Sequence, residues 1–182
     1  MHIISKPEIP HAYAIRESLH TGSEINITGH VTHRYFKDFT VDLLSGEHIV
    51  LHINFRFHLD QQRVIMNSKV YGVWGIEHDY HNPLHNDDKF HLKIHVHQNY
   101  YHITLNGKHL ADFPHRKPIQ TVQAIGLQGC VHIEDIVFTG FEFGLDWNDP
   151  HDYGHCGYLH YGTDKYEAPK FSDNHILGAH FQ

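Results

Sequence analysis

Apolar and polar residues alternate along much of the chain between residues 9 and 141. This period of two is expected of β-strands that bury one face, because successive side chains point to opposite sides. The clearest segments are 24–31, 39–43, 49–57, 63–67, 90–97, 101–105 and 131–138, separated by turn pairs such as Asn106-Gly107. No segment shows a sustained helical period. We therefore predict an all-β fold, either a two-sheet antiparallel sandwich, which we favour, or a barrel.

Residues 142–182 differ in composition from the rest of the chain. They contain eight aromatic residues and five glycines, without clean alternation. This is too aromatic for a flexible linker, so the segment either packs against the sandwich or is partly disordered. We divide the chain into an N-terminal lead (1–8), one domain of ordinary size (9–141) and an aromatic, glycine- and histidine-rich C-terminal extension (142–182).

Charge and hydropathy exclude several classes of function. The net charge is −7 and the basic residues are scattered, which argues against nucleic acid as a partner. The chain has no apolar run of bilayer length and no signal-peptide stretch at its start, so we expect neither membrane insertion nor Sec-dependent export. Cys130 and Cys156 are too few for a disulfide framework; we expect thiols, with a single bridge as the alternative.

Segment 51–57 carries an unusual row of polar side chains. Its odd-numbered residues are apolar and should face the core, which places His52, Asn54 and Arg56 together on the other face. A structural strand would more often have Thr, Ser, Lys or Glu at such positions. A row of hydrogen-bonding groups at this spacing suits a polyhydroxylated ligand.

A second polar set follows in 63–77. It consists of Asn67, Trp74 and Glu77, and the flanking Gly72 and Gly75 indicate a turn or bulge that lets Trp74 and Glu77 face the same way. A flat aromatic ring accepts the apolar face of a pyranose while polar side chains take its hydroxyls. Galactose suits this best, because its axial 4-hydroxyl leaves one ring face apolar. The alternative is that Trp74 belongs to the core and that the polar residues simply face solvent. This would explain each residue by itself, but not the spacing of the whole set.

The motifs His52-x-Asn54-Phe55-Arg56, Val64-x-Met66-Asn67 and Trp74-Gly75-x-Glu77 resemble the carbohydrate-recognition signature of the galectins. The resemblance covers about residues 9–141, with further matches at Gly22, 101–107, 113–116 and 133–138. It implies a jelly-roll sandwich with the site on its concave sheet, and calcium-independent β-galactoside binding without catalysis. By motif position it implies that His52, Asn54 and Arg56 contact the galactose 4-hydroxyl and its surroundings, Asn67 and Glu77 the 6-hydroxyl, and that Trp74 stacks on the ring.

Two positions depart from the family pattern. Phe55 replaces the usual proline and should point inward, which changes packing more than contacts. Asp79 replaces the usual arginine, so a cation beside Glu77 is lost and a like charge is added. We expect a weaker Glu77–Arg56 network and a weaker grip on a second sugar. The alternative function is therefore a protein-interaction module on a galectin fold with a degenerate sugar site.

The chain contains 23 histidines, a residue type that can bind metal ions or take part in catalysis. His91, His95 and His97 share one strand face, but Lys93 lies among them, and 151–156 is a histidine-rich loop. We predict no metal ligands and no cofactor. Glu77 and Asp79 would lie side by side instead of flanking a glycosidic bond, so we also predict no enzyme activity.

The resemblance also bears on partners and location. We expect β-galactoside-containing glycans or glycoconjugates as ligands, with homo-oligomerisation left open. Galectins generally lack signal peptides, so we expect the cytoplasm, the extracellular space reached by unconventional secretion, or both. Protonation of so many histidines should lower both glycan binding and stability between about pH 7.5 and 5.

Overall fold

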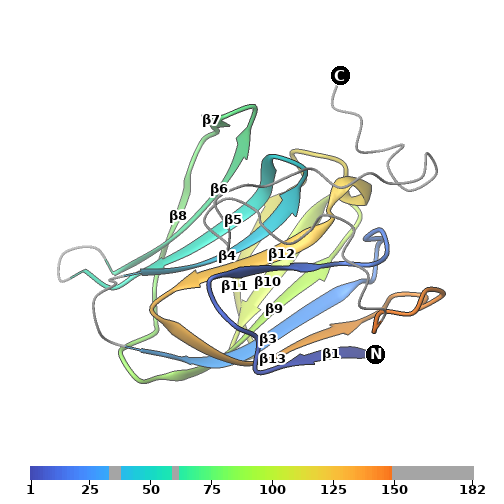
Figure 1. Cartoon of the computed structure of the whole chain (residues 1–182). Helices are drawn as coiled ribbons and strands as arrows, with labels where there is room; N and C mark the ends of the chain where they lie inside the picture. The colour runs from blue at the N-terminus through green and yellow to red at the C-terminus, as the bar shows by residue number, and fades with distance from the viewer. Residues whose placement is uncertain (33–37, 59–61, 149–182) are drawn as a thin grey trace.

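The computed structural model describes residues 1–32, 38–58 and 62–148, which form two antiparallel sheets lying face to face (Figure 1). One sheet has six strands, in the order β1 (His2–Ser5), β13 (Val131–Thr139), β3 (Glu24–Val31), β9 (Lys89–Val96), β10 (Tyr100–Leu105) and β11 (Lys108–Pro114). The other has seven: β2 (His11–Ala14), β12 (Ala124–Gly129), β4 (Asp38–Ser45), β5 (His48–Arg56), β6 (Arg63–Val70) and β7 (Val73–Trp74), with β8 (His78–His81) also paired to β6. A short 3₁₀ turn, η1, spans Ile119–Thr121. The predicted two-sheet sandwich is confirmed, and the barrel alternative is wrong.

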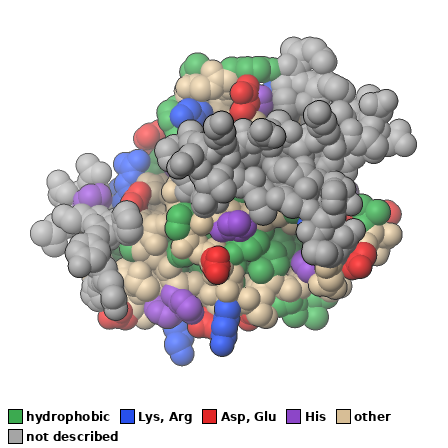
Figure 2. Space-filling view, in the orientation of Figure 1, with side chains coloured by type: hydrophobic (Ala, Val, Ile, Leu, Met, Phe, Trp, Pro, Cys, Tyr) green, Lys and Arg blue, Asp and Glu red, His purple; other side chains and the backbone are tan. Residues whose placement is uncertain are grey.

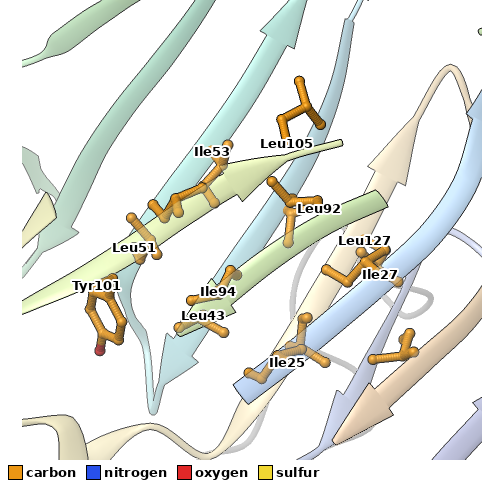
Figure 3. Close-up of a cluster of buried hydrophobic side chains, with 14 of the residues drawn as sticks. Ile25, Ile27, Leu43, Leu51, Ile53, Leu92, Ile94, Tyr101, Leu105 and Leu127 are labelled. Carbon is orange, nitrogen blue, oxygen red and sulfur yellow. The ribbon is translucent and has the colours of Figure 1, made fainter. Parts of the chain in front are cut away.

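The core lies between the two sheets, as the alternation predicted. Figure 3 shows side chains from strands of both sheets pointing into one shared interior, among them Leu51 of β5 and Leu92 of β9. Phe55 is fully buried and stacks on Phe39, with ring centroids 4.6 Å apart, and Phe39 in turn stacks on Phe90 of the opposite sheet at 5.4 Å. The inward orientation predicted for Phe55 is therefore confirmed.

Several strands that the alternation did not predict complete the two sheets. β1 and β2 are only four residues long, and β7 has two. β1 pairs with β13 over its whole length, so residues 2–5 belong to the sandwich. β12 carries four consecutive buried residues, which a period of two cannot reveal. Alternation of apolar and polar residues identifies only strands with one buried and one solvent-exposed face. It therefore does not predict short edge strands or strands that are buried on both faces.

The start of the C-terminal extension packs against the sandwich. Trp147 is buried, lies 5.1–5.3 Å in ring-centroid distance from Phe138, Phe141 and Phe143, and its Nε1 donates a hydrogen bond to Glu17 at 2.8 Å. Residues 142–148 therefore follow the packed alternative of the two considered for this extension. The remainder of the extension, including Cys156 and the histidine-rich segment 151–156, lies outside the described residues.

Three further properties bear on the expectations from the sequence. Among the described residues, no helix has the length and hydropathy that a membrane crossing requires. Cys130 is a buried free thiol, and burial, with a contribution from Asp38, raises its pKa to about 11. On the face shown in Figure 2, histidines occur at several separate places, so their protonation adds charge to this face at several points.

Candidate functional site

The polar row of β5 lies on the outer face of the seven-stranded sheet. Leu51, Ile53 and Phe55 are fully buried, so the alternating His52 and Arg56 point outward. On β4, Asp42 lies directly opposite His52, and on β6 Asn67 does so from the other side. The strand register therefore gathers polar groups from three neighbouring strands around His52.

His52 is held in one orientation by Asp42. The Nδ1 atom of His52 lies 2.7 Å from Oδ1 of Asp42, whose side chain is only 2% exposed. A carboxylate at this distance accepts a hydrogen bond from Nδ1–H, so Nε2 of the neutral His52 ring is the hydrogen-bond acceptor. The buried aspartate thus sets the tautomer that His52 presents to a ligand.

Asn54 is placed to orient Arg56. Its Nδ2 donates to Asp38 Oδ2 at 2.9 Å and to Thr40 Oγ1 at 3.0 Å, while its Oδ1 accepts from Arg56 Nε at 2.7 Å. Asn54 is buried, so these contacts occupy much of its amide. The guanidinium of Arg56 is fixed at its Nε and keeps its terminal nitrogens for other partners.

A tight hairpin between β6 and β7 presents the aromatic side chain. Tyr71 and Gly72 both have positive φ, 51° and 77°, which is the backbone of a two-residue turn that closes such a hairpin. Trp74 on β7 is 44% exposed and its ring centroid lies 4.8 Å from that of His52. The turn predicted around Gly72 is therefore confirmed, and it places the indole beside the polar row.

Arg116, which follows β11 of the other sheet, braces this hairpin. Its Nη1 donates to Asn67 Oδ1 at 2.8 Å and to Ser68 Oγ at 3.1 Å, and its Nη2 donates to the carbonyl of Ile76 at 2.6 Å. Glycine at position 75 leaves room for this contact, because a Cβ there would lie 2.8 Å from Arg116 Nη1 and would displace it. Asn67 Nδ2 completes the link by donating to the Gly75 carbonyl at 2.9 Å.

These contacts enclose a cavity of about 320 Å³ on the outer face of the seven-stranded sheet. Its lining residues are His52, Arg56, Ile65, Asn67, Trp74, Gly75 and Glu77. Five of the six residues selected from the sequence therefore share one cavity, and the sixth, Asn54, supports Arg56 from beneath. In the sequence, Arg116 is distinguished only by lying in segment 113–116, which matches the galectin pattern. No local feature of the sequence indicates that its side chain reaches the other sheet.

The family match agrees with this arrangement. The galactoside-binding lectin family model matches residues 10–138. The chain belongs to the galactoside-binding lectins. The lectin is 59% identical over 181 residues to the probable galaptin lec-8 of Caenorhabditis elegans, with both chains covered completely. It is 42% identical to the probable galaptin lec-7 of the same organism, covering 83% of this chain and 84% of that one.

A solved relative shows the same architecture. The crystal structure of C. elegans galectin LEC-6 superposes with a TM-score of 0.70 at 27% identity, covering 75% of this chain and 95% of that one. The resemblance to the galectins and the sandwich that it implied are thereby confirmed. The lectin thus combines a fold shared with its relatives and a cavity lined by its own signature residues.

Asp79 of the lectin has a partner that its sequence position did not reveal. Its Oδ1 accepts from Arg63 Nε at 2.6 Å, across the pairing of β8 with β6. Arg63 lies on the same face of β6 as Ile65 and Asn67, two lining residues of the cavity. A guanidinium from the neighbouring strand therefore neutralises Asp79, and the repulsion expected from Glu77 is reduced.

Removing the brace should weaken the site without unfolding the lectin. We expect Arg116→Ala to lower galactoside affinity by about 1–2 kcal/mol, or roughly tenfold, because Asn67 and the Ile76 carbonyl lose their charged donor. Titration calorimetry against lactose measures this change. Arg116→Lys keeps the positive charge but not the two-pronged guanidinium, and should lower galactoside affinity by an intermediate amount. Unchanged affinity in Arg116→Ala would show that the hairpin holds its shape without the brace.

Proposed function

We propose that the lectin binds galactose-type glycans non-covalently in this cavity, without catalysis. The observation that carries the proposal is the half-exposed Trp74 ring at the wall of a cavity that is also lined by four polar side chains, those of His52, Arg56, Asn67 and Glu77. One apolar plane facing several hydrogen-bonding groups matches a galactose ring, which has one C–H-rich face and hydroxyls at its edges. Membership of the galactoside-binding lectins supports the same ligand class.

The proposed roles follow the contacts of each side chain. Trp74 stacks on the apolar face of the sugar. His52 accepts a hydrogen bond from a sugar hydroxyl at Nε2, because Nδ1–H donates to Asp42. Arg56 donates from its terminal nitrogens, because Asn54 holds its Nε. Asn67 and Glu77 bind a further hydroxyl from the β6 side of the cavity, with Asn67 already oriented by Arg116.

Calorimetric titration with lactose and with methyl β-galactoside tests this function. We expect dissociation constants between millimolar and micromolar, equivalent to about 4–8 kcal/mol. A glycan array on the same protein then defines the class of acceptor. A folded sample that binds no galactose-terminated glycan would favour the rival function, a protein-interaction module on the same fold.

Arg63 should matter most for the second sugar of a disaccharide. Arg63 lies two residues before Ile65 on β6 and therefore on the same face of the sheet. Its Nε donates to Asp79, so we expect its terminal nitrogens to reach a sugar unit beyond the galactose. We expect Arg63→Ala to lower affinity for lactose by about 1 kcal/mol, roughly fivefold, because the group is half exposed. Affinity for methyl β-galactoside should change little. An equal loss for both ligands would place Arg63 at the first sugar instead.

The protonation of His48 should affect the hairpin that carries Trp74. His48 is buried, and its Nδ1 accepts the backbone N–H of Tyr71 at 3.0 Å, at the turn that presents Trp74. Burial lowers the pKa of His48 below 6.5, nearby Lys117 lowers it further, and Glu47 opposes both. A proton on Nδ1 removes this acceptor. Because the folded pKa lies below that of the unfolded chain, the associated stability is present above pH 6.5 and is lost as the pH falls through the folded pKa.

We therefore expect the urea midpoint and galactoside affinity to fall as the pH drops below about 6.5. His48→Asn keeps an acceptor oxygen near the Nδ1 position and should flatten part of this dependence. His132→Asn, on the exposed face of the other sheet, is the matched control and should leave the profile unchanged. Burial likewise lowers the pKa values of His2 and His95, so the residual slope keeps the same sign. Identical profiles in His48→Asn and wild type would exclude the role of His48.

A further inference from the structure

A cluster of imidazole and carboxylate groups lies on the outer face of the six-stranded sheet, away from the sugar cavity. His102 on β10 is paired directly with Asp112 on β11. The residues on either side of each, such as Tyr101 and Phe113, are buried, so both polar side chains point outward. The pairing therefore places a nitrogen ligand and an oxygen ligand next to each other across two strands.

A β-bulge brings a third group to the same face. His109 and Asp112 are three residues apart on β11, a spacing that a regular strand would place on opposite faces. The register shifts here: Ile103 pairs with Ala111 but Thr104 pairs with His109, so Leu110 is the extra residue. The bulge returns His109 to the face of Asp112, where its ring stacks on that of His102 with centroids 4.8 Å apart.

The three potential ligand atoms already converge. Asp112 Oδ1 lies 2.7 Å from His102 Nδ1 and 3.0 Å from His109 Nε2, and all three atoms lie within 4.8 Å of one another. A tetrahedral Zn²⁺ with ligands at about 2.0–2.2 Å separates its ligand atoms by roughly 3.4 Å. Small side-chain movements are therefore enough to admit an ion. Burial opposes ionisation of Asp112, but hydrogen bonds from His102 and His109 hold its pKa below the ordinary value, so it is anionic at neutral pH.

We propose that His102, His109 and Asp112 form a binding site for a transition-metal dication of the Zn²⁺ type, with water completing its coordination. Two imidazoles and one carboxylate are a donor set that favours such ions over Ca²⁺ or Mg²⁺, which prefer oxygen ligands. On binding, each imidazole presents the lone pair of the nitrogen that now faces Asp112 and carries its proton on the other ring nitrogen. On binding, the Asp112 carboxylate loses its hydrogen bonds from His102 and His109 and gains a contact with the cation.

The surroundings of the cluster are compatible with a cation. The ring of His97 lies 5.3 Å from that of His102 and 4.6 Å from that of His95, which adds further imidazoles at the margin. Lys93, which argued against a site on strand 90–97, has its Nζ 3.9 Å from Glu24 Oε1. The sequence could not predict this site, because its members lie on two strands and depend on the bulge at Leu110.

Zinc titrations of the full chain test the site. Calorimetry would compare wild type with His109→Ala and Asp112→Ala, and imidazole ¹H–¹⁵N NMR would identify which rings respond first. His132→Ala is the matched control, because His132 also contacts a carboxylate, Glu134, and a second ring, that of His30. Among the described residues, the three-ligand spacing is met by His102, His109 and Asp112 alone. Both test positions are exposed, so the variants should fold, which circular dichroism checks.

In wild type we expect a zinc-binding class that both test variants lose and His132→Ala retains, with the His102 and His109 signals moving first. The loss should exceed the roughly 10- to 100-fold that removal of an outer-shell partner costs. Affinity for lactose should be the same in all four proteins, which separates this site from the sugar cavity. Four identical titrations, or first responses from other histidines, including those of segment 151–182, would overturn the proposal.

Discussion

Trp74→Ala is expected to remove measurable galactoside binding while leaving the fold intact. The indole supplies the largest apolar ring among the residues that line the cavity, and its centroid lies 4.8 Å from that of the His52 ring. Truncating such an anchor typically costs about 2–4 kcal/mol. Starting from millimolar to micromolar affinity, a loss of roughly 30- to 1000-fold moves most ligands beyond detection. Titration calorimetry with lactose, supported by a glycan array, provides the measurement.

Two further variants make the Trp74 result specific. Val73→Ala removes an exposed side chain from the adjacent position of the same short strand, whose side chain points the other way, and should bind lactose as wild type does. Trp74→Phe keeps a smaller ring and should retain part of the affinity. Binding that survives in Trp74→Ala would mean that the sugar occupies another surface, and the proposed cavity would be wrong.

The largest expected effect on stability comes from Phe55→Ala. Phe55 is completely buried and stacks on Phe39, which stacks on Phe90 of the opposite sheet, so this column of rings joins the two layers. Truncation of a buried phenylalanine costs about 3–5 kcal/mol. That is a large share of the roughly 5–15 kcal/mol that stabilises a typical domain. Urea unfolding followed by tryptophan fluorescence would show a much lower midpoint.

Phe55→Leu serves as the matched variant, since it keeps an apolar side chain and should lose less. Lactose affinity of the folded fraction should be nearly unchanged in both variants, because the Phe55 side chain points away from His52 and Arg56. A shift below about 1 kcal/mol in Phe55→Ala would show that the core closes around the deletion. A large loss of affinity at full stability would show that the departure from the family's usual proline reaches the sugar site.

The strands that could be predicted from the sequence are those with one face in solvent and the other in the core. Segment 24–31 corresponds to β3 over its whole length, and 131–138 to β13 within one residue, because both strands have solvent on one side only. The same physical signal located the row of β5, where His52 and Arg56 alternate with buried residues. Strands with other surroundings, such as β12, carry no such pattern and were missed.

The contacts that complete the candidate site are non-local, and this limits what a linear pattern can predict. Asp79 was expected to repel Glu77, yet its nearest cation, Arg63, lies 16 positions away and is brought beside it by the pairing of β6 with β8. Arg116 lies 49 positions from Asn67 and belongs to the connection leaving the other sheet. Both contacts depend on strand order and register, which are properties of the assembled sandwich.

The position of Arg116 has a thermodynamic consequence. Because its side chain crosses from the end of one sheet to the hairpin of the other, the hairpin that carries Trp74 gains this brace only when the two layers have docked. A bound sugar then favours the docked state of the whole molecule by RT ln(1 + [L]/Kd), about 1.4 kcal/mol at ten times the dissociation constant. Glycans would therefore act as folding ligands for this chain, raising its melting temperature and slowing its proteolysis wherever they are abundant.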